Sequence, residues 1–186
     1  MNQIKFAMLA TLLTLAGCAG FNAAMTPSAE IIKDDFDGAT IIRQSPVGSS
    51  SSLTESWHTL GFEWSTGKPD TIYITAGLVM QTENIQEVQF KADGELIENI
   101  ELASNKTEFE NNASSRRFSL PLSEFRKIAA AHIVKMKIIY NIGNNSSVSS
   151  FGQDYPNVLT TSKIPPFMSK VDELRAAIEK KHSTTN

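Results

Sequence analysis

Two-residue alternation of apolar and polar side chains is the feature that most limits what this chain can fold into. It runs through three segments, residues 56–64, 85–92 and 133–142. Alternation of this period places every second side chain on the same face of an extended strand. In the first segment Leu60, Phe62 and Trp64 share one face, with polar or small residues between them. Such strands predict a sheet with one buried and one polar face, which is typical of antiparallel pairing.

Turn-forming residues separate these segments and indicate further strands. Asp93-Gly94 is a strong hairpin signal and predicts that residues 95–102 return as the partner strand of 85–92. Shorter β-rich segments predict more strands at 39–43, 71–80 and 117–120. The Gly/Ser segment 48–52 and the polar segment 143–147 predict loops, the second running on with weak structure to Pro156.

Two helices are predicted late in the chain, where the apolar period changes. Pro121 marks a break, Ser123 is the predicted N-cap, and Phe125 and Ile128 lie on one apolar side of a short helix. After Pro165-Pro166 we expect a helix of about fifteen residues. Its apolar stripe, which needs a sheet face to cover, consists of Phe167, Val171, Leu174 and Ile178.

These elements together predict the α+β class. We expect a mainly antiparallel sheet of about six to seven strands, with a short inserted helix and a C-terminal amphipathic helix packed on it. A β-sandwich with a peripheral helix is the alternative. The helices and strands alternate too rarely for a doubly wound parallel sheet.

The N-terminus has the features of a cleaved leader. Lys5 supplies a positive charge, and the apolar run 6–15 is too short to span a bilayer, which takes roughly 20 residues. The run ends in Leu15-Ala16-Gly17-Cys18, which places the only cysteine directly after two small residues. This arrangement resembles the lipobox of bacterial lipoproteins.

The resemblance implies a lipid anchor at Cys18. In that family the cysteine thiol receives a diacylglyceryl group, the leader is cut before the cysteine, and the new amine is commonly acylated with a fatty acid such as palmitate. The implied organisation is a signal peptide over 1–17, a lipidated tether over 18–29 and one globular domain over 30–186. The bilayer is then a partner through Cys18. An ordinary secretory leader with a free thiol, or a buried N-terminal helix, are the alternatives.

Sorting follows from the residues after the cysteine. Ala19-Gly20 carry no aspartate. In enteric-type bacteria this is similar to lipoproteins sent to the outer membrane, where the domain would face the periplasm.

Composition excludes several classes of function. The chain has 17 Lys and Arg against 20 Asp and Glu, so a nucleic-acid partner is not expected. A single cysteine rules out an intrachain disulfide and a Cys/His zinc framework. Asp35-Phe36-Asp37-Gly38 supplies only half of an EF-hand ligand set, and the position that needs Glu is Gln44. We therefore expect neither a metal nor a cofactor.

The candidate site residues are aromatic or histidine. Trp57, Trp64 and Tyr73 are candidates for a platform that stacks on a glycan or another small ligand, although core packing is the preferred explanation of these aromatic residues. His58 and His132, the two histidines that precede the C-terminal helix, would be the bases of a hydrolase, although a lone histidine is more often a packed residue than a base. No nucleophile-elbow or phosphate-loop motif accompanies them.

Three functions follow, in order of preference. The first is a non-enzymatic envelope lipoprotein that binds another protein or assists assembly. The second is an anchored module that binds a small ligand or glycan. The third is a hydrolase with an unrecognised site. The basic positions that suit an anionic surface are Arg116, Arg117, Lys135 and Lys137.

Overall fold

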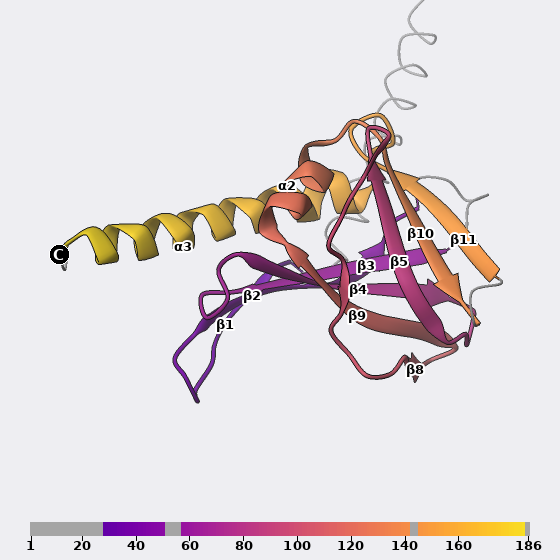
Figure 1. Cartoon of the computed structure of the whole chain (residues 1–186), viewed down its shortest axis with the longest axis horizontal. Helices are drawn as coiled ribbons and strands as arrows, with labels where there is room; N and C mark the ends of the chain where they lie inside the picture. Colours follow the sequence, from indigo (N-terminus) through magenta and orange to yellow (C-terminus); the bar gives the residue numbers. More distant parts are fainter. Residues whose placement is uncertain (1–27, 51–56, 142–144, 185–186) are drawn as a thin grey trace, which may run out of the picture.

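Two antiparallel sheets and two α-helices make up the computed structural model, which describes residues 28–50, 57–141 and 145–184 (Figure 1). The predicted α+β class is confirmed. The expected signal peptide, Cys18 and most of the tether lie outside the described residues. Within them, no helix combines the length and the apolar character that crossing a bilayer requires.

The larger sheet has seven strands in the order β1-β2-β3-β4-β9-β7, with β8 paired to the same edge of β9 as β7. Every pairing in it is antiparallel. The strands are β1 (Glu30–Lys33), β2 (Thr40–Gly48), β3 (His58–Ser65), β4 (Thr71–Val79), β7 (Glu101–Leu102), β8 (Glu108–Glu110) and β9 (Ala113–Pro121).

The smaller sheet has four strands in the order β11-β10-β5-β6. The Asp93-Gly94 turn joins β5 to β6 as predicted, and both residues have positive φ, 50° and 91°. This is the backbone that a tight hairpin turn requires. The strands are β5 (Ile85–Ala92), β6 (Glu95–Leu96), β10 (Val134–Tyr140) and β11 (Asn145–Phe151).

The helices are α2 (Leu122–Ala130) and α3 (Ile164–Thr184), the latter preceded by a π-helical turn, η1 (Leu159–Lys163). Both α-helices bury their apolar side against the larger sheet. Phe62 of β3 lies 4.6 Å from Phe167 of α3 and 5.4 Å from Phe125 of α2, measured between ring centroids. The predicted stripe of α3 is present, with Phe167 and Val171 buried. The rest of α3 extends beyond the sheets (Figure 1).

Several sequence expectations were wrong in detail. Residues 95–102 do not form one strand, because β6 joins the smaller sheet and β7 the larger one. The polar segment expected to be a loop contains β11, which pairs with β10 over seven residues. This strand has no alternating apolar pattern in its sequence, because two of its serines, Ser147 and Ser149, contact the side chain of His58 on β3.

The ends of other elements also differ from the prediction. Helix α2 begins two residues earlier than expected, and its N-cap is Pro121 with no side-chain cap, so Ser123 lies inside the first turn. Strand β1 was not predicted, and β9 begins at Ala113 rather than 117. Helix α3 spans 21 residues, longer than the about fifteen expected. Strand pairing and tertiary packing decide where these helices and strands begin and end, so the local sequence does not predict their exact ends.

One core joins all these elements, and one face of the larger sheet is left uncovered by the residues that the structure describes. The inward side chains of both sheets pack with α2 and the first half of α3 in a single cluster. On the other side of the larger sheet, polar and charged side chains of β2, β3, β4 and β9 are half-buried or exposed. We call this side the open face, and its central residues are Arg43, Glu63, Tyr73, Thr75 and Arg117.

Candidate functional site

Strand register brings the charged residues of the open face together. Arg43 on β2 lies opposite Glu63 on β3, and Glu63 lies opposite Tyr73 on β4. Thr75, two residues further along β4, lies opposite Arg117 on β9. Residues that are directly opposite or two apart share a sheet face and lie within side-chain reach. Four neighbouring strands therefore contribute to one cluster.

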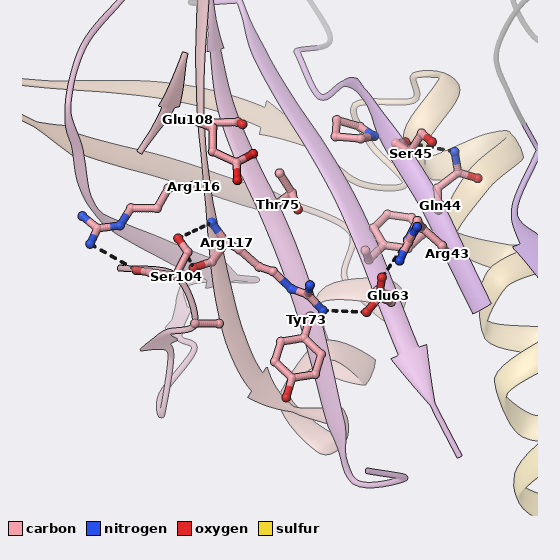
Figure 2. Close-up of a pocket in the computed structure, with 14 residues that line it drawn as sticks. Arg43, Gln44, Ser45, Glu63, Tyr73, Thr75, Ser104, Glu108, Arg116 and Arg117 are labelled. Carbon is pink, nitrogen blue, oxygen red and sulfur yellow. Dashed lines mark hydrogen bonds and ion pairs between the residues drawn. The ribbon is translucent and has the colours of Figure 1, made fainter. Parts of the chain in front are cut away.

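Glu63 bridges two arginines at the centre of this cluster. Its Oε2 accepts a hydrogen bond from Arg43 Nε at 2.7 Å, and its Oε1 accepts one from Arg117 Nη2 at 2.5 Å (Figure 2). The Glu63 side chain is only 15% exposed, while those of Arg43 and Arg117 are 49% and 40% exposed. The carboxylate thus lies low on the sheet and holds two accessible guanidinium groups in fixed positions.

The Tyr73 ring packs against the guanidinium group of Arg117. The Arg117 guanidinium carbon lies 4.3 Å from the centroid of the Tyr73 ring, which is a cation–π geometry. The Tyr73 hydroxyl accepts a hydrogen bond from Lys68 Nζ at 2.9 Å. We call Arg43, Glu63, Tyr73 and Arg117 the arginine cluster.

The arginine cluster lines a cavity of about 400 Å³ on the open face. This volume is at the small end of the range typical of ligand pockets. One wall is the β-bulge at Ser45-Pro46, where the pairing of β2 with β3 shifts register. Another is the segment between β7 and β8. The remaining lining residues are Gln44, Phe62, Thr75, Ala103, Ser104, Glu108, Ser115 and Arg116.

Gly61 allows the bulge to approach β3. A Cβ atom at this position would lie 2.8 Å from the backbone nitrogen of Pro46 and 2.9 Å from two of its ring carbons. Atoms do not pack that closely, so any side chain at residue 61 would push the bulge away. The glycine therefore fixes the shape of this cavity wall.

Arg116 has a structural part in the opposite wall. Its Nη1 donates to the carbonyl oxygen of Ile85 at 2.6 Å and its Nη2 to that of Ser104 at 3.3 Å. Those bonds fix the segment between β7 and β8 to the start of β5. Although Arg116 lines the cavity, its terminal nitrogens already have backbone acceptors, whereas among the described residues the Arg43 guanidinium bonds to Glu63 through its Nε alone.

The three aromatic candidates are not brought together. Trp64 is fully buried, and its ring nitrogen donates to the carbonyl oxygen of Pro69 at 2.9 Å. Trp57 is 49% exposed and lies at the other end of β3 from Trp64, where its carbonyl accepts from Val79. Tyr73 alone lines the cavity, as part of the arginine cluster. The rings therefore do not form a shared stacking platform.

The two candidate histidines lie in unrelated places. His58 is 1% exposed, and its ring nitrogens lie 2.8 and 2.7 Å from the hydroxyls of Ser149 and Ser147 on β11. Those contacts join the two sheets, and burial closes the ring to a substrate. His132 has its Nδ1 3.3 Å from Asp154 Oδ1, but both side chains are more than half exposed. An exposed pair of this kind lacks the pocket that a catalytic base needs.

The remaining charged candidates are also separate from the cavity. Lys135 is exposed on β10, whose pairing partners are β5 and β11 of the smaller sheet. Asp34 and Asp37 accept hydrogen bonds from the backbone of their own turn, between β1 and β2. Within the described ranges, no three His, Cys, Asp or Glu residues are grouped as metal ligands. On α2, a hydrogen bond to Glu124 raises the pKa of Lys127 above its ordinary value.

The sequence predicted two of the four residues of the arginine cluster, Tyr73 as a candidate ligand contact and Arg117 as a basic position. Arg43 and Glu63 were not among the candidates. The residues of the arginine cluster come from four strands, and Arg43 and Arg117 are 74 positions apart in the chain. A correct strand register would have found them, because all point to the polar face of their strands.

No known protein-family model matches this chain, and a search of curated proteins found no matching sequence. Its function is therefore argued from the site itself.

Proposed function

We propose that this protein is a membrane-anchored bacterial envelope lipoprotein whose role is binding or assembly rather than catalysis. The lipid would be attached at Cys18, and the domain would bind its partner through the open face. The observation that carries the binding role is the arginine cluster: two accessible guanidinium groups, held by one carboxylate, in a cavity of about 400 Å³.

The magnitude of the interactions supports a binding role for the cluster. Ion pairs between half-exposed side chains typically stabilise a fold by only 0.2–1 kcal/mol each. Fixed guanidinium groups at a surface are, in contrast, well suited to ligands that carry carboxylate or phosphate. The cluster therefore adds little to stability in comparison with what it offers to a ligand.

The length of the tether supports action close to the membrane. Nine residues lie between Cys18 and Ser28, where the described structure begins, so ten residue-to-residue steps connect the two. A fully extended chain covers at most about 3.6 Å per residue, so the domain would lie within roughly 36 Å of the leaflet. Ala19-Gly20 after the cysteine favour the outer membrane, with the domain facing the periplasm.

Metabolic labelling tests the anchor. Cells expressing the full chain would be grown with radioactive palmitate, beside cells expressing Cys18→Ala. We expect label in the wild-type protein alone and membrane sedimentation that the variant loses, because two or more acyl chains give stable anchoring. An unmodified thiol at Cys18 in the purified protein would remove the anchor from the proposal.

Photo-cross-linking in cells tests the binding surface. A photoreactive amino acid would replace Thr75 inside the cavity or, as a matched control, Lys135 on the smaller sheet. We expect an adduct of defined mass from position 75 that disappears when Arg117→Ala is added, and persists when Lys137→Gln is added. An adduct that is independent of Arg117, or equal at both positions, would contradict binding through the open face.

A further inference from the structure

We infer that the arginine cluster binds a singly charged carboxylate of a small ligand or short peptide, between Arg43 and Arg117. This inference rests on the proposed function, since it names the chemistry of the ligand at the same open face. Four observations support it: the donors that remain on the two arginines, the charge of the cavity, its polar lining and its size.

The two arginines retain hydrogen-bond donors on the cavity side. A guanidinium carries five N–H donors in a planar fork. Within the described ranges, Arg43 uses its Nε on Glu63, and Arg117 uses one terminal nitrogen on the same carboxylate. The two terminal nitrogens of Arg43 are the pair that binds a planar oxyanion in bidentate fashion.

Glu63 keeps both groups in place before a ligand arrives. The carboxylate fixes the end of each arginine, and the Tyr73 ring fixes the plane of Arg117. Long flexible side chains otherwise lose conformational freedom when they bind, at a cost to affinity. We therefore assign Glu63 and Tyr73 as positioning residues and the two arginines as ligand contacts.

The charge of the cavity favours one negative charge over two. Three arginines and two glutamates line it, which gives a formal charge of +1 on a chain whose net charge is −3. One carboxylate neutralises that lining. A phosphate group carries about −1.5 to −2 at neutral pH, so part of its charge would face Glu63 and Glu108 without compensation.

The polar lining and the size of the cavity suit a short peptide or a similar molecule. Thr75 and Ser115 line the cavity, and a hydroxyl group can bond to amide groups beside the carboxylate. Pro46 and Ala103 add small apolar surfaces at its sides. A cavity of about 400 Å³ admits a few residues and excludes a folded domain.

Nuclear magnetic resonance titration of the full chain in detergent tests this inference. Arginine would be labelled with ¹⁵N, so that the Nε–H signals of Arg43 and Arg117 report binding directly. The probes are N-acetyl-alanyl-alanine, its C-terminal amide, acetate and inorganic phosphate. We expect the free-acid peptide to shift both signals, the amide to leave them unchanged, and phosphate to bind more weakly than the acid.

Variants that preserve the positive charge distinguish bidentate binding by a guanidinium group from the effect of charge alone. Arg43→Lys and Arg117→Lys keep the positive charge but lose bidentate geometry, and each should weaken the acid about tenfold or more. Lys135→Gln, which removes an exposed charge on the smaller sheet, should change the affinity less than about twofold. Unchanged backbone spectra establish that each variant folds.

Saturation by acetate at the same concentration as the peptide supports a carboxylate site and identifies a free acid as its source. Equal binding of the amide, tighter binding of phosphate, or no effect of either lysine variant overturns the inference. If these probes fail while position 75 still cross-links in an Arg117-dependent manner, the ligand chemistry is wrong and the binding role stands. If both fail, both are wrong.

Discussion

Removal of the Glu63 carboxylate distinguishes a cluster that stabilises the fold from one that serves a ligand. Glu63→Ala breaks two ion pairs at once, those with Arg43 and Arg117. An ion pair between partly exposed groups typically stabilises a fold by about 0.2–1 kcal/mol. The low exposure of Glu63 places its two ion pairs in the upper half of that range. We therefore expect the free energy of unfolding to fall by about 1–2 kcal/mol, or roughly 2–8 °C in Tm.

Urea unfolding of the full chain in detergent measures this change, with the buried Trp64 as the fluorescent probe. Asp172→Ala is a matched control, because it breaks one ion pair with Arg126 between α2 and α3, where both side chains are about half exposed. We expect it to cost about 0.2–1 kcal/mol. A loss above about 3 kcal/mol for Glu63→Ala would be the behaviour of a buried, structural pair and would refute this reasoning.

Three further predictions concern the scaffold around the site. Phe167→Ala removes the ring contact between α3 and β3 and should lower the free energy of unfolding, measured in urea, by about 3–5 kcal/mol. The control Phe36→Ala, at a 99% exposed position, should change it by less than about 0.5 kcal/mol, and equal effects would show that α3 is not packed on the sheet. Gly61→Ala should lower the free energy of unfolding by about 1–3 kcal/mol and weaken binding of N-acetyl-alanyl-alanine, because the added Cβ displaces the bulge. A variant with wild-type affinity and Tm would show that Gly61 does not fix the cavity wall. Ser149→Ala removes a hydroxyl partner of His58 and should speed amide hydrogen exchange in β11, whereas unchanged exchange rates would contradict a role in joining the two sheets.

The sequence predicted those parts of the fold that depend on local pattern. The Asp93-Gly94 turn, the alternation of β3 and the stripe of α3 are each read from neighbouring residues, and the structure confirms them. Residues 95–102 show where this reading ends. One continuous segment supplies strands to two different sheets, and only tertiary contacts decide between them.

The candidate site was harder to predict because it depends on register. The Arg43–Glu63 contact joins residues 20 apart, and the Arg117–Glu63 contact joins residues 54 apart. Their polar types are typical of any solvated strand face, so composition gives no sign that they meet. Aromatic residues attracted attention because they are rare, and Trp64 proved to be part of the core.

A crystal structure of the chain with N-acetyl-alanyl-alanine is the most direct measurement of the central claim. We predict electron density for the peptide in the cavity on the open face, with its carboxylate within about 3.2 Å of guanidinium nitrogens of Arg43 and Arg117. Glu63 should keep its contacts with both arginines. A peptide bound elsewhere on the domain, or one whose carboxylate points away from the arginine cluster, would contradict the account.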